Sequence, residues 1–148
     1  MNCAGMLKTD ASPKFIFMAA CIRYTCPQCQ FSVDGWSDGN RYLTDHQGKR
    51  HYFYHPSDIT KMRAFAEEQT GGVMKETEYL AFLKERCGNE GDWLCLRCGC
   101  QTRRDPRHDP MQCPECGQCN LRSTFNLEGR TCPKCTKVTF YGEMGAIS

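Results

Sequence analysis

Alternating hydrophobic and polar positions dominate the first third of the chain and predict β-structure. A strand is expected from Ile22 into the segment Cys26–Val33, which contains a tight turn. Residues 41–44 and 50–54 are strand-like and flank the loop Asp45–Lys49, in which Gly48 can adopt a positive φ. This combination favours a β-hairpin over residues 41–54.

Helical spacing replaces the alternation between residues 57 and 87. Ser57 is a candidate N-cap for a first helix that ends at Gly71–Gly72, with apolar residues at Ile59, Met62, Phe65 and Ala66. A second helix is predicted from about Met74 to Cys87. Its apolar face is expected to carry Leu80, Leu83 and Cys87 beside Thr77, and Gly88 suits the C′ position that ends a helix.

The rest of the chain predicts short strands and turns without a long helix. We expect four segments: a disordered leader over 1–20, a first region over 21–92, a cysteine-rich region over 93–141 and a flexible tail over 142–148. The leader lacks the apolar run of a signal peptide, and no segment approaches the roughly 18 apolar residues of a membrane-spanning helix. We therefore expect a cytoplasmic protein without a membrane partner.

Cysteine spacing changes this picture most. The chain has 13 cysteines, eight of which form four Cys-x-x-Cys pairs: Cys26/Cys29, Cys95/Cys98, Cys113/Cys116 and Cys132/Cys135. An odd count, paired spacing and the absence of a signal peptide favour reduced thiols over disulfides. Two such pairs complete a tetrahedral S4 site, so the eight thiolates predict two closed, structural metal sites, with zinc as the expected ion at both.

The sequence leaves the partner of each pair open. Sequential pairing would join 26/29 to 95/98 and 113/116 to 132/135, whereas nested pairing would join 95/98 to 113/116 and 26/29 to 132/135. Loop-closure entropy grows only with the logarithm of loop length, so the two schemes differ by less than about 1 kcal/mol. Glycines after the second and third pairs favour nesting, and the helix pair as an insertion within one ribbon favours the sequential scheme.

The remaining cysteines and the histidines have weaker claims to ligate metal. Cys119 could replace Cys113, Cys100 sits beside the second pair, and Cys87 fits the core face of the second helix; Cys3 and Cys21 are expected to be incidental. His51 and His55 have the wrong spacing for a site of two cysteines and two histidines. With His46 they are substitutes only if one cysteine pair lacks its partner.

These residues resemble the zinc-ribbon and rubredoxin-like class. Residues 93–99, WLCLRCG, followed by CPECG at 113–117, look like the rubredoxin-type domain of rubrerythrins, and residues 113–135 look like a generic short zinc ribbon. The resemblance covers residues 93–135 only, and residues 30–92 match no such pattern. It implies metal-centred β-hairpins, and iron in place of zinc at Cys95, Cys98, Cys113 and Cys116 is the alternative, but it implies no single activity.

Composition supports metal as a substitute for a large core. The apolar fraction is 40% and the mean hydropathy is −0.61, which is thin for a single core of 148 residues. The fold class that follows is small α+β, with two zinc-ribbon-like four-cysteine elements, an extra β-hairpin and a two-helix insertion.

Charge offers only weak support for a nucleic-acid partner. Residues 94–140 hold eight Lys or Arg against four acids, within a net charge of +2. Two Zn(Cys)4 units would take that net charge to about −2, so much of the basic excess can serve to neutralise thiolates.

Two segments are candidate partner surfaces. The hairpin carries aromatic and basic residues, namely Tyr42, Tyr52, Tyr54, Arg41, Lys49 and Arg50, with Trp36 nearby; this set suits single-stranded nucleic acid, although packing against the helix pair is favoured. The 101–108 loop carries Arg103, Arg104, Arg107 and His108.

No catalytic set and no small-molecule site is evident in the sequence. The expected function is therefore a non-enzymatic, zinc-binding adaptor for a protein or nucleic-acid partner. The alternative is a rubredoxin-like electron carrier.

Overall fold

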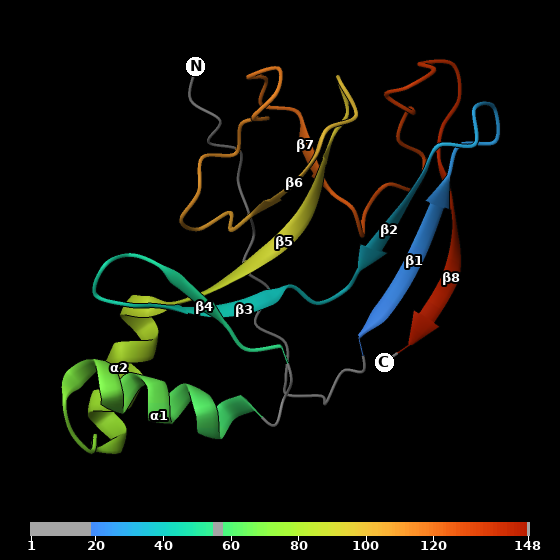
Figure 1. Cartoon of the computed structure of the whole chain (residues 1–148). Coiled ribbons are helices and arrows are strands. Elements are labelled where there is room, and N and C mark those ends of the chain that lie inside the picture. The colour runs from blue at the N-terminus through green and yellow to red at the C-terminus, as the bar shows by residue number, and fades with distance from the viewer. Residues whose placement is uncertain (1–18, 55–57, 148) are drawn as a thin grey trace. The chain divides into compact units, whose positions relative to one another are not determined.

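Eight strands and two helices form the part of the chain that the computed structural model describes, residues 19–54 and 58–147. In chain order they are β1 (Ala20–Thr25), β2 (Ser32–Trp36), β3 (Asn40–Thr44), β4 (Arg50–Tyr52), α1 (Ile59–Thr70), α2 (Glu76–Arg86), β5 (Cys87–Cys95), β6 (Gln101–Arg104), β7 (Leu121–Ser123) and β8 (Tyr141–Ile147) (Figure 1). This small α+β fold, with two cysteine clusters, a β-hairpin and a helix pair, confirms the predicted class.

The strands form two sheets. One has the order β2-β1-β8, with both pairs antiparallel, so the two ends of the described chain lie in neighbouring strands (Figure 1). The other follows the order β4-β3-β5-β6, with β7 as a further partner of β5. Strand β5 is long enough to pair with β3 through Cys87–Glu90 and with β7 through Trp93–Cys95.

The chain folds into two compact units that do not follow chain order. The ribbon unit contains described residues 19–38, 92–104 and 109–147, and the helical unit contains residues 39–91 and 105–108. The sequence placed its division at residues 92 and 93. In the structure the first cysteine pair and the C-terminal strand belong to the same unit as the other three Cys-x-x-Cys pairs.

The core of the ribbon unit is small and surrounds cysteine side chains. Tyr24, Val33, Leu94, Leu127 and Phe140 are buried with Cys26 and Cys132. A second cluster joins Cys95 and Cys113 to Leu121. The buried cysteine sulfurs and their apolar neighbours leave water together when the unit folds. Formation of the apolar core and formation of the cysteine clusters therefore depend on each other.

The helical unit has its own apolar core, in which Leu43 of β3 packs with residues of both helices and of the segment between them: Met62, Ala66, Met74, Tyr79 and Phe82. The predicted hairpin is confirmed, because β3 and β4 pair antiparallel with Tyr42 opposite Tyr52. His51 of β4 and Phe53, directly after this strand, contact Phe65 of α1, with ring centroids 4.7 and 5.9 Å away. The favoured packing of the hairpin against the helix pair is therefore present.

Helix α2 differs from its prediction in its buried face and in its end. Leu83 and Cys87 pack against the core as predicted, but Leu80 is 56% exposed, and Tyr79 and Phe82 are the buried residues of the helix. The aromatic residues have more apolar area to bury than Leu80 and therefore take the core positions.

The helix ends at Arg86, and Gly88 lies in β5 instead of at a helix cap. A Cβ at Gly88 would collide with the Tyr42 ring and with Asp105 Oδ2. Close packing of β5 against these two side chains therefore requires a glycine here. In the sequence alone, such a glycine cannot be distinguished from one that ends a helix.

The C-terminal segment also differs from its prediction. Residues 142–148 were expected to form a flexible tail, but Tyr141–Ile147 forms β8 and pairs with β1 from Ala20 to Thr25. Gly142 suggests a chain break in sequence. In the sheet it faces Tyr24, where a Cβ would meet that ring, so the glycine permits the pairing.

Some predictions fall on residues outside the described part of the chain. These are the leader up to residue 18, the proposed N-cap Ser57, His55 and the last residue. Strand β1 begins at Ala20, the final residue of the predicted leader, and Asp58 precedes the first residue of α1. Neither described helix is long and apolar enough to cross a membrane.

Candidate metal centres

The four Cys-x-x-Cys segments adopt one backbone conformation. In each, the amide of the residue after the second cysteine donates to the carbonyl of the first cysteine, at 2.8–2.9 Å, as in Gly99 N to Cys95 O. The amide of the first cysteine donates in turn to a carbonyl five or six residues later, as in Cys113 N to Gln118 O. We call each such turn a knuckle.

The residue after the second cysteine has a positive φ in every knuckle. Gly99 and Gly117 adopt φ values of 77° and 69°, which glycine does without strain. Gln30 and Thr136 occupy the same position in the other two knuckles, with φ of 61° and 58°. The sequence shows the glycines plainly, but it gives no sign that Gln30 and Thr136 serve the same role.

The structure joins the knuckles in the nested scheme. The first cluster contains Cys26, Cys29, Cys132 and Cys135, and the second contains Cys95, Cys98, Cys113 and Cys116. These are the eight cysteines that the spacing predicts. The alternative that joins 26/29 to 95/98 is excluded by this arrangement.

Each cluster is built on the same three-strand plan. Knuckle 26–29 is the turn between β1 and β2, and knuckle 132–135 precedes β8, which pairs with β1. Knuckle 95–98 is likewise the turn between β5 and β6, and knuckle 113–116 precedes β7, which pairs with β5. Strand pairing therefore delivers the second knuckle of each cluster to the first, which explains the nested choice.

Distances between the sulfurs fit a tetrahedral metal ion. Between the two knuckles of the first cluster, the Sγ atoms of Cys26 and Cys135 lie 3.6 Å apart and those of Cys29 and Cys132 lie 3.7 Å apart. In the second cluster the Sγ atoms of Cys95 and Cys116 lie 3.6 Å apart and those of Cys98 and Cys113 lie 3.5 Å apart.

All four sulfurs of a cluster lie within 4.8 Å of one another. Zn–S bonds of about 2.3 Å in a tetrahedron place sulfurs about 3.8 Å apart, whereas a disulfide requires about 2.05 Å. The two clusters could therefore each hold a metal ion with four thiolate ligands.

Backbone amides of the knuckles favour thiolates. Burial raises the pKa of the Cys26 thiol, but N–H groups of Cys29 and Gln28 and the neighbouring thiols outweigh it and lower this pKa to about 7. In the second cluster burial is likewise outweighed by the N–H groups of Cys116 and Glu115, and the pKa of Cys113 falls to about 6.

Other sulfurs of the clusters behave in the opposite way. An N–H group of Phe31 lowers the pKa of Cys29, but burial and the thiols of Cys26 and Cys132 raise it to about 11. Four thiolates this close repel one another, so a cation at their centre is what allows all of them to ionise. The donor set therefore fits a divalent metal ion.

Lys134 is a further residue of the clusters that the sequence did not single out. It lies inside knuckle 132–135, and its Nζ donates to the carbonyl of Cys98 in the second cluster, at 3.4 Å. The same ammonium lies 5.6 Å from the Phe31 ring centroid. One lysine thus connects the two clusters and adds a positive charge beside the thiolates.

The other described cysteines lie outside both ligand sets. Cys100 packs beside the second cluster with its Sγ 3.6 Å from the carbonyl of Gln101, and Cys119 is exposed and does not replace Cys113. Cys87 packs against the core of the helical unit, where burial is the main cause of its raised pKa. Cys21 is buried in β1, and Cys3 lies outside the described residues.

His46 and His51 have protein partners other than cysteine. His51 Nε2 lies 2.8 Å from Asp45 Oδ2, and His46 Nδ1 lies 3.0 Å from Gln69 Oε1. Because each knuckle has a partner knuckle, no histidine is needed to complete a cluster.

Four residues of the predicted partner surface, Tyr42, Arg50, Tyr52 and Tyr54, lie together on one face of the hairpin. Tyr52 and Tyr54 stack at 5.9 Å with an interplanar angle of 13°, on the side opposite His51 and Phe53. Arg50 lies 4.4 Å from the centroid of Tyr42 and forms a salt bridge with the buried Glu90. Its charge is therefore compensated within the unit.

The 101–108 segment is not one loop. Gln101–Arg104 forms β6, and Asp105–His108 belongs to the helical unit. Arg103 pairs with Asp92 at 3.2 Å, and Arg104 Nη1 donates to the carbonyl of Arg103. Two of the arginines proposed for partner contact thus already have internal partners.

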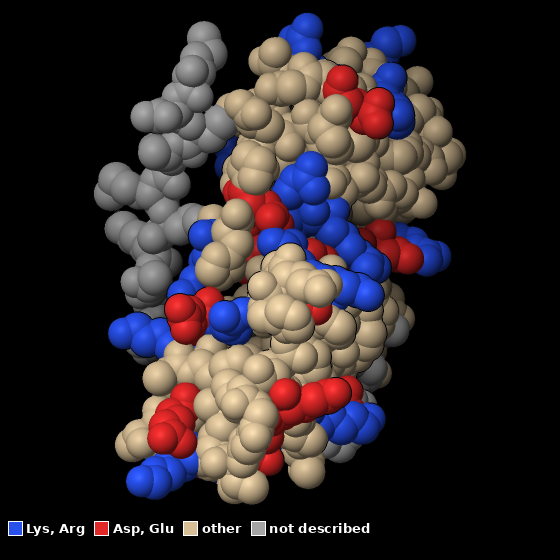
Figure 2. Space-filling view, turned by 60° about the vertical axis from the view of Figure 1, so that its left-hand side comes forward, with Lys and Arg blue, Asp and Glu red and all other residues tan. Residues whose placement is uncertain are grey.

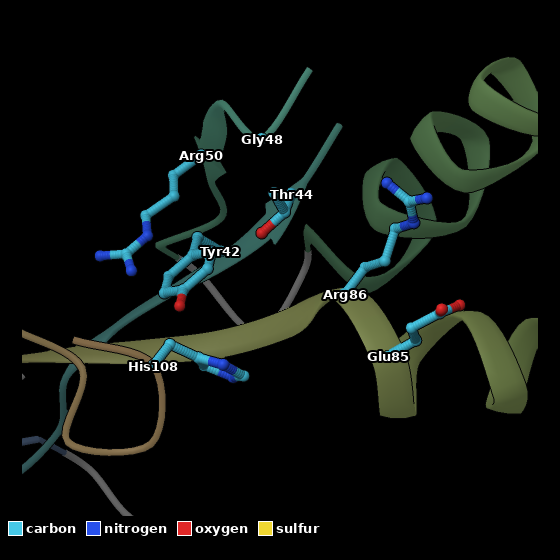
Figure 3. Close-up of a pocket in the computed structure, with 7 residues that line it drawn as sticks. All are labelled: Tyr42, Thr44, Gly48, Arg50, Glu85, Arg86 and His108. Atoms are coloured by element: carbon cyan, nitrogen blue, oxygen red, sulfur yellow. The ribbon is translucent and has the colours of Figure 1, made fainter. Parts of the chain in front are cut away.

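A cavity of about 300 Å³ lies in the helical unit, lined in part by Tyr42, Arg50, Arg86 and His108. Figure 3 shows the guanidinium groups of Arg50 and Arg86 pointing away from each other. Arg86 donates to the carbonyl of Asp45 at 2.9 Å, and Arg50 pairs with Glu90. The cationic groups therefore do not converge on a common ligand position.

Comparisons with models of protein families, with curated proteins and with solved structures return no match for this chain. The likeness to the zinc-ribbon class therefore depends on the cysteine spacing and on two cysteine clusters that could hold metal.

Proposed function

We propose that this chain is a non-enzymatic zinc-binding ribbon protein that acts as an adaptor for a macromolecular partner. The observation that carries the proposal is the pair of four-cysteine clusters, each with four sulfurs within 4.8 Å and each built from two knuckles. Four protein ligands fill a tetrahedral site and leave no position for a substrate, so such a zinc ion is structural.

The position of the clusters supports a structural role. Cys26, Cys95, Cys113 and Cys132 are buried among the apolar residues that form the two cores of the ribbon unit. Zinc at these positions would hold three strands together in each half of the unit and supply folding free energy that a core of this size lacks. A protein held in this way presents a fixed surface, which is what an adaptor requires.

Elemental analysis tests the metal part of this proposal. Protein expressed without added metal is expected to contain about two zinc ions per chain and to show no visible absorbance. Less than one metal ion per chain in total would contradict it.

The second candidate is a rubredoxin-like electron carrier with iron at Cys95, Cys98, Cys113 and Cys116. In its favour, this cluster has glycines with positive φ in both knuckles, and Cys98 and Cys116 are only half-buried, which leaves a route for electron exchange. Thiolates bind both metals well, so the same sample decides between them. Iron with thiolate charge-transfer bands would favour the carrier over the adaptor.

A further inference from the structure

A second cavity, of about 460 Å³, lies in the ribbon unit and was not anticipated from the sequence. It is lined by Tyr24 of β1, Trp93 of β5, Arg122 of β7, and Asn126, Glu128 and Arg130 from the segment after β7. Its volume lies within the range of about 300–1,000 Å³ that is typical of ligand sites. We call it the ribbon pocket.

The positive charges of the ribbon pocket lack protein partners. Within the described part of the chain, the side chains of Arg122, Asn126 and Arg130 make no hydrogen bond or ion pair. Arg103, Arg50 and Arg63 each pair with a carboxylate. Guanidinium groups present several donors in a planar fork that matches phosphate, so two uncompensated arginines in one cavity favour an anionic ligand.

The negative charge of the pocket is already engaged. Glu128 Oε2 accepts a hydrogen bond of 2.7 Å from the backbone amide of Gly142 in β8. Two guanidinium groups against this one carboxylate leave the lining with an excess of positive charge.

An aromatic wall lies beside the arginines. Trp93 Nε1 donates to the carbonyl of Arg104 at 3.0 Å, which fixes the orientation of the indole, and the ring remains half-buried. Tyr24 is 3% exposed and donates its hydroxyl to the carbonyl of Phe125 at 2.7 Å, so it forms a rigid wall. A flat indole next to free guanidinium groups suits a ligand with both a base and a phosphate.

The distribution of charge on the face shown in Figure 2 is mixed. Figure 2 shows Lys and Arg interspersed with Asp and Glu on the face in view, without a broad region of one sign. This face therefore offers no broad positive surface for a polyanion. The ribbon pocket combines uncompensated arginines with an aromatic wall, whereas the cavity of the helical unit has arginines that are paired and divergent (Figure 3).

We propose that the ribbon pocket binds one nucleotide of a single-stranded nucleic acid, with the phosphate at Arg122 and Arg130, the base against Trp93, and Asn126 at a base edge. This deepens the proposed function and rests on it, because the metal clusters hold β1, β5 and β7 in place around the pocket. A strand is favoured over a free nucleotide because neighbouring nucleotides add contacts along an open surface and raise the effective concentration of each.

The test is binding of a fluorescein-labelled ten-nucleotide RNA of mixed sequence to the full-length zinc-loaded protein, followed by fluorescence anisotropy at several salt concentrations. The double variant Arg122→Ala/Arg130→Ala is expected to bind at least tenfold more weakly at low salt. Loss of two phosphate contacts should also flatten the slope of log K against log salt by about 1.4.

A charge-matched control uses Lys84→Ala/Lys137→Ala, two exposed lysines outside the pocket lining and outside both candidate partner segments, which make no described side-chain pair. This variant is expected to bind within about twofold of the unchanged protein. Equal weakening by both double variants would show attraction to net charge only and would overturn the pocket proposal. The zinc content and far-UV spectrum of each variant identify a loss that is due to unfolding.

Two competitors separate the possible sources of the anion. Adenosine monophosphate at equal nucleotide concentration should displace little RNA, and polyglutamate should displace less than unlabelled RNA does. Displacement by the mononucleotide as efficient as by RNA would point to a free nucleotide, and efficient displacement by polyglutamate would point to an acidic protein; either would overturn the single-strand proposal.

The two proposals fail in different ways. Two zinc ions per chain with no RNA binding at 50 mM salt would overturn the ribbon pocket as a nucleotide site and leave the zinc-ribbon proposal intact. Fewer than one metal ion per chain would overturn the proposed function itself.

Discussion

At the scale of single residues, the clearest features are the knuckle positions after the second cysteine. All four require a positive φ, yet only two of them are glycine. An L-residue with a side chain is strained in this region, and a β-branched residue such as Thr136 more so. The first cluster therefore carries backbone strain that the second one does not.

This difference gives a pair of substitutions with opposite signs. Gly117→Ala should lower the free energy of unfolding by about 1 kcal/mol, because a Cβ there meets no atom within 4 Å and only φ is penalised. Thr136→Gly should raise it by up to about 1 kcal/mol through relief of strain, less the entropy that glycine gains in the unfolded chain. Urea unfolding at a fixed free zinc concentration measures both, and the same sign for the two variants would contradict the argument.

A second prediction at this scale concerns Asp45, which is nearly buried in the helical unit. The pKa of this carboxyl is lowered to about 2, below its ordinary value near 4. The main cause is the hydrogen bond with His51, and the backbone amides of Lys49 and Gln47 add to it. A group with a depressed pKa stabilises the fold above its unfolded pKa, and this contribution disappears as pH falls through the folded value.

The stability difference between the unchanged protein and Asp45→Asn should therefore shrink as pH falls from about 4 to about 2. Asparagine can still accept the amide of Lys49, so the variant removes mainly the charge. Urea unfolding of both proteins at matched pH measures this difference. Acid removes zinc from both proteins alike, so the effect of zinc loss cancels in the comparison. A difference that is constant over this range would show that the carboxylate charge does not stabilise the unit.

At the scale of elements, local signals were predictable and long-range pairings were not. Each knuckle follows from two cysteines and a turn, and the hairpin follows from alternation around Gly48, so both are visible within a few residues. Strand β8 was missed because its pairing with β1 bridges more than 100 residues, and its glycines look like chain breaks. The buried face of α2 was predicted correctly at Leu83 and Cys87 and wrongly at Leu80, because Leu80 and Tyr79 offer competing stripes that only the tertiary packing resolves.

Knuckle pairing is the element-scale feature that can be tested directly by counting zinc. The variant Cys26→Ser/Cys132→Ser removes two ligands from one cluster and should retain about one zinc ion per chain. The variant Cys26→Ser/Cys95→Ser removes one ligand from each cluster and should retain almost none. Sequential pairing requires the reverse result, so elemental analysis of these two proteins decides between the schemes even if each variant is less stable.

At the scale of the whole molecule, the two units should respond differently to loss of metal. Both clusters lie in the ribbon unit, whereas the helical unit has an apolar core formed by Leu43, Met62, Ala66 and Phe82. The first cluster also closes a loop between residues 29 and 132, which are 103 positions apart. A covalent link across about 100 residues would be worth about 4–5 kcal/mol in loop-closure entropy, and a metal link acts on the same term.

A strong chelator should therefore unfold the ribbon unit first. Hydrogen exchange followed by mass spectrometry is expected to show lost protection in peptides covering β1, β2 and β8, while peptides over α1 and α2 keep most of theirs. Because the helical unit retains both helices, the far-UV helical signal should fall little on chelation. Simultaneous loss of protection in both sets of peptides would mean that zinc stabilises the chain as one cooperative unit. Unchanged exchange after complete zinc removal would show that strand pairing and the small apolar core suffice without metal.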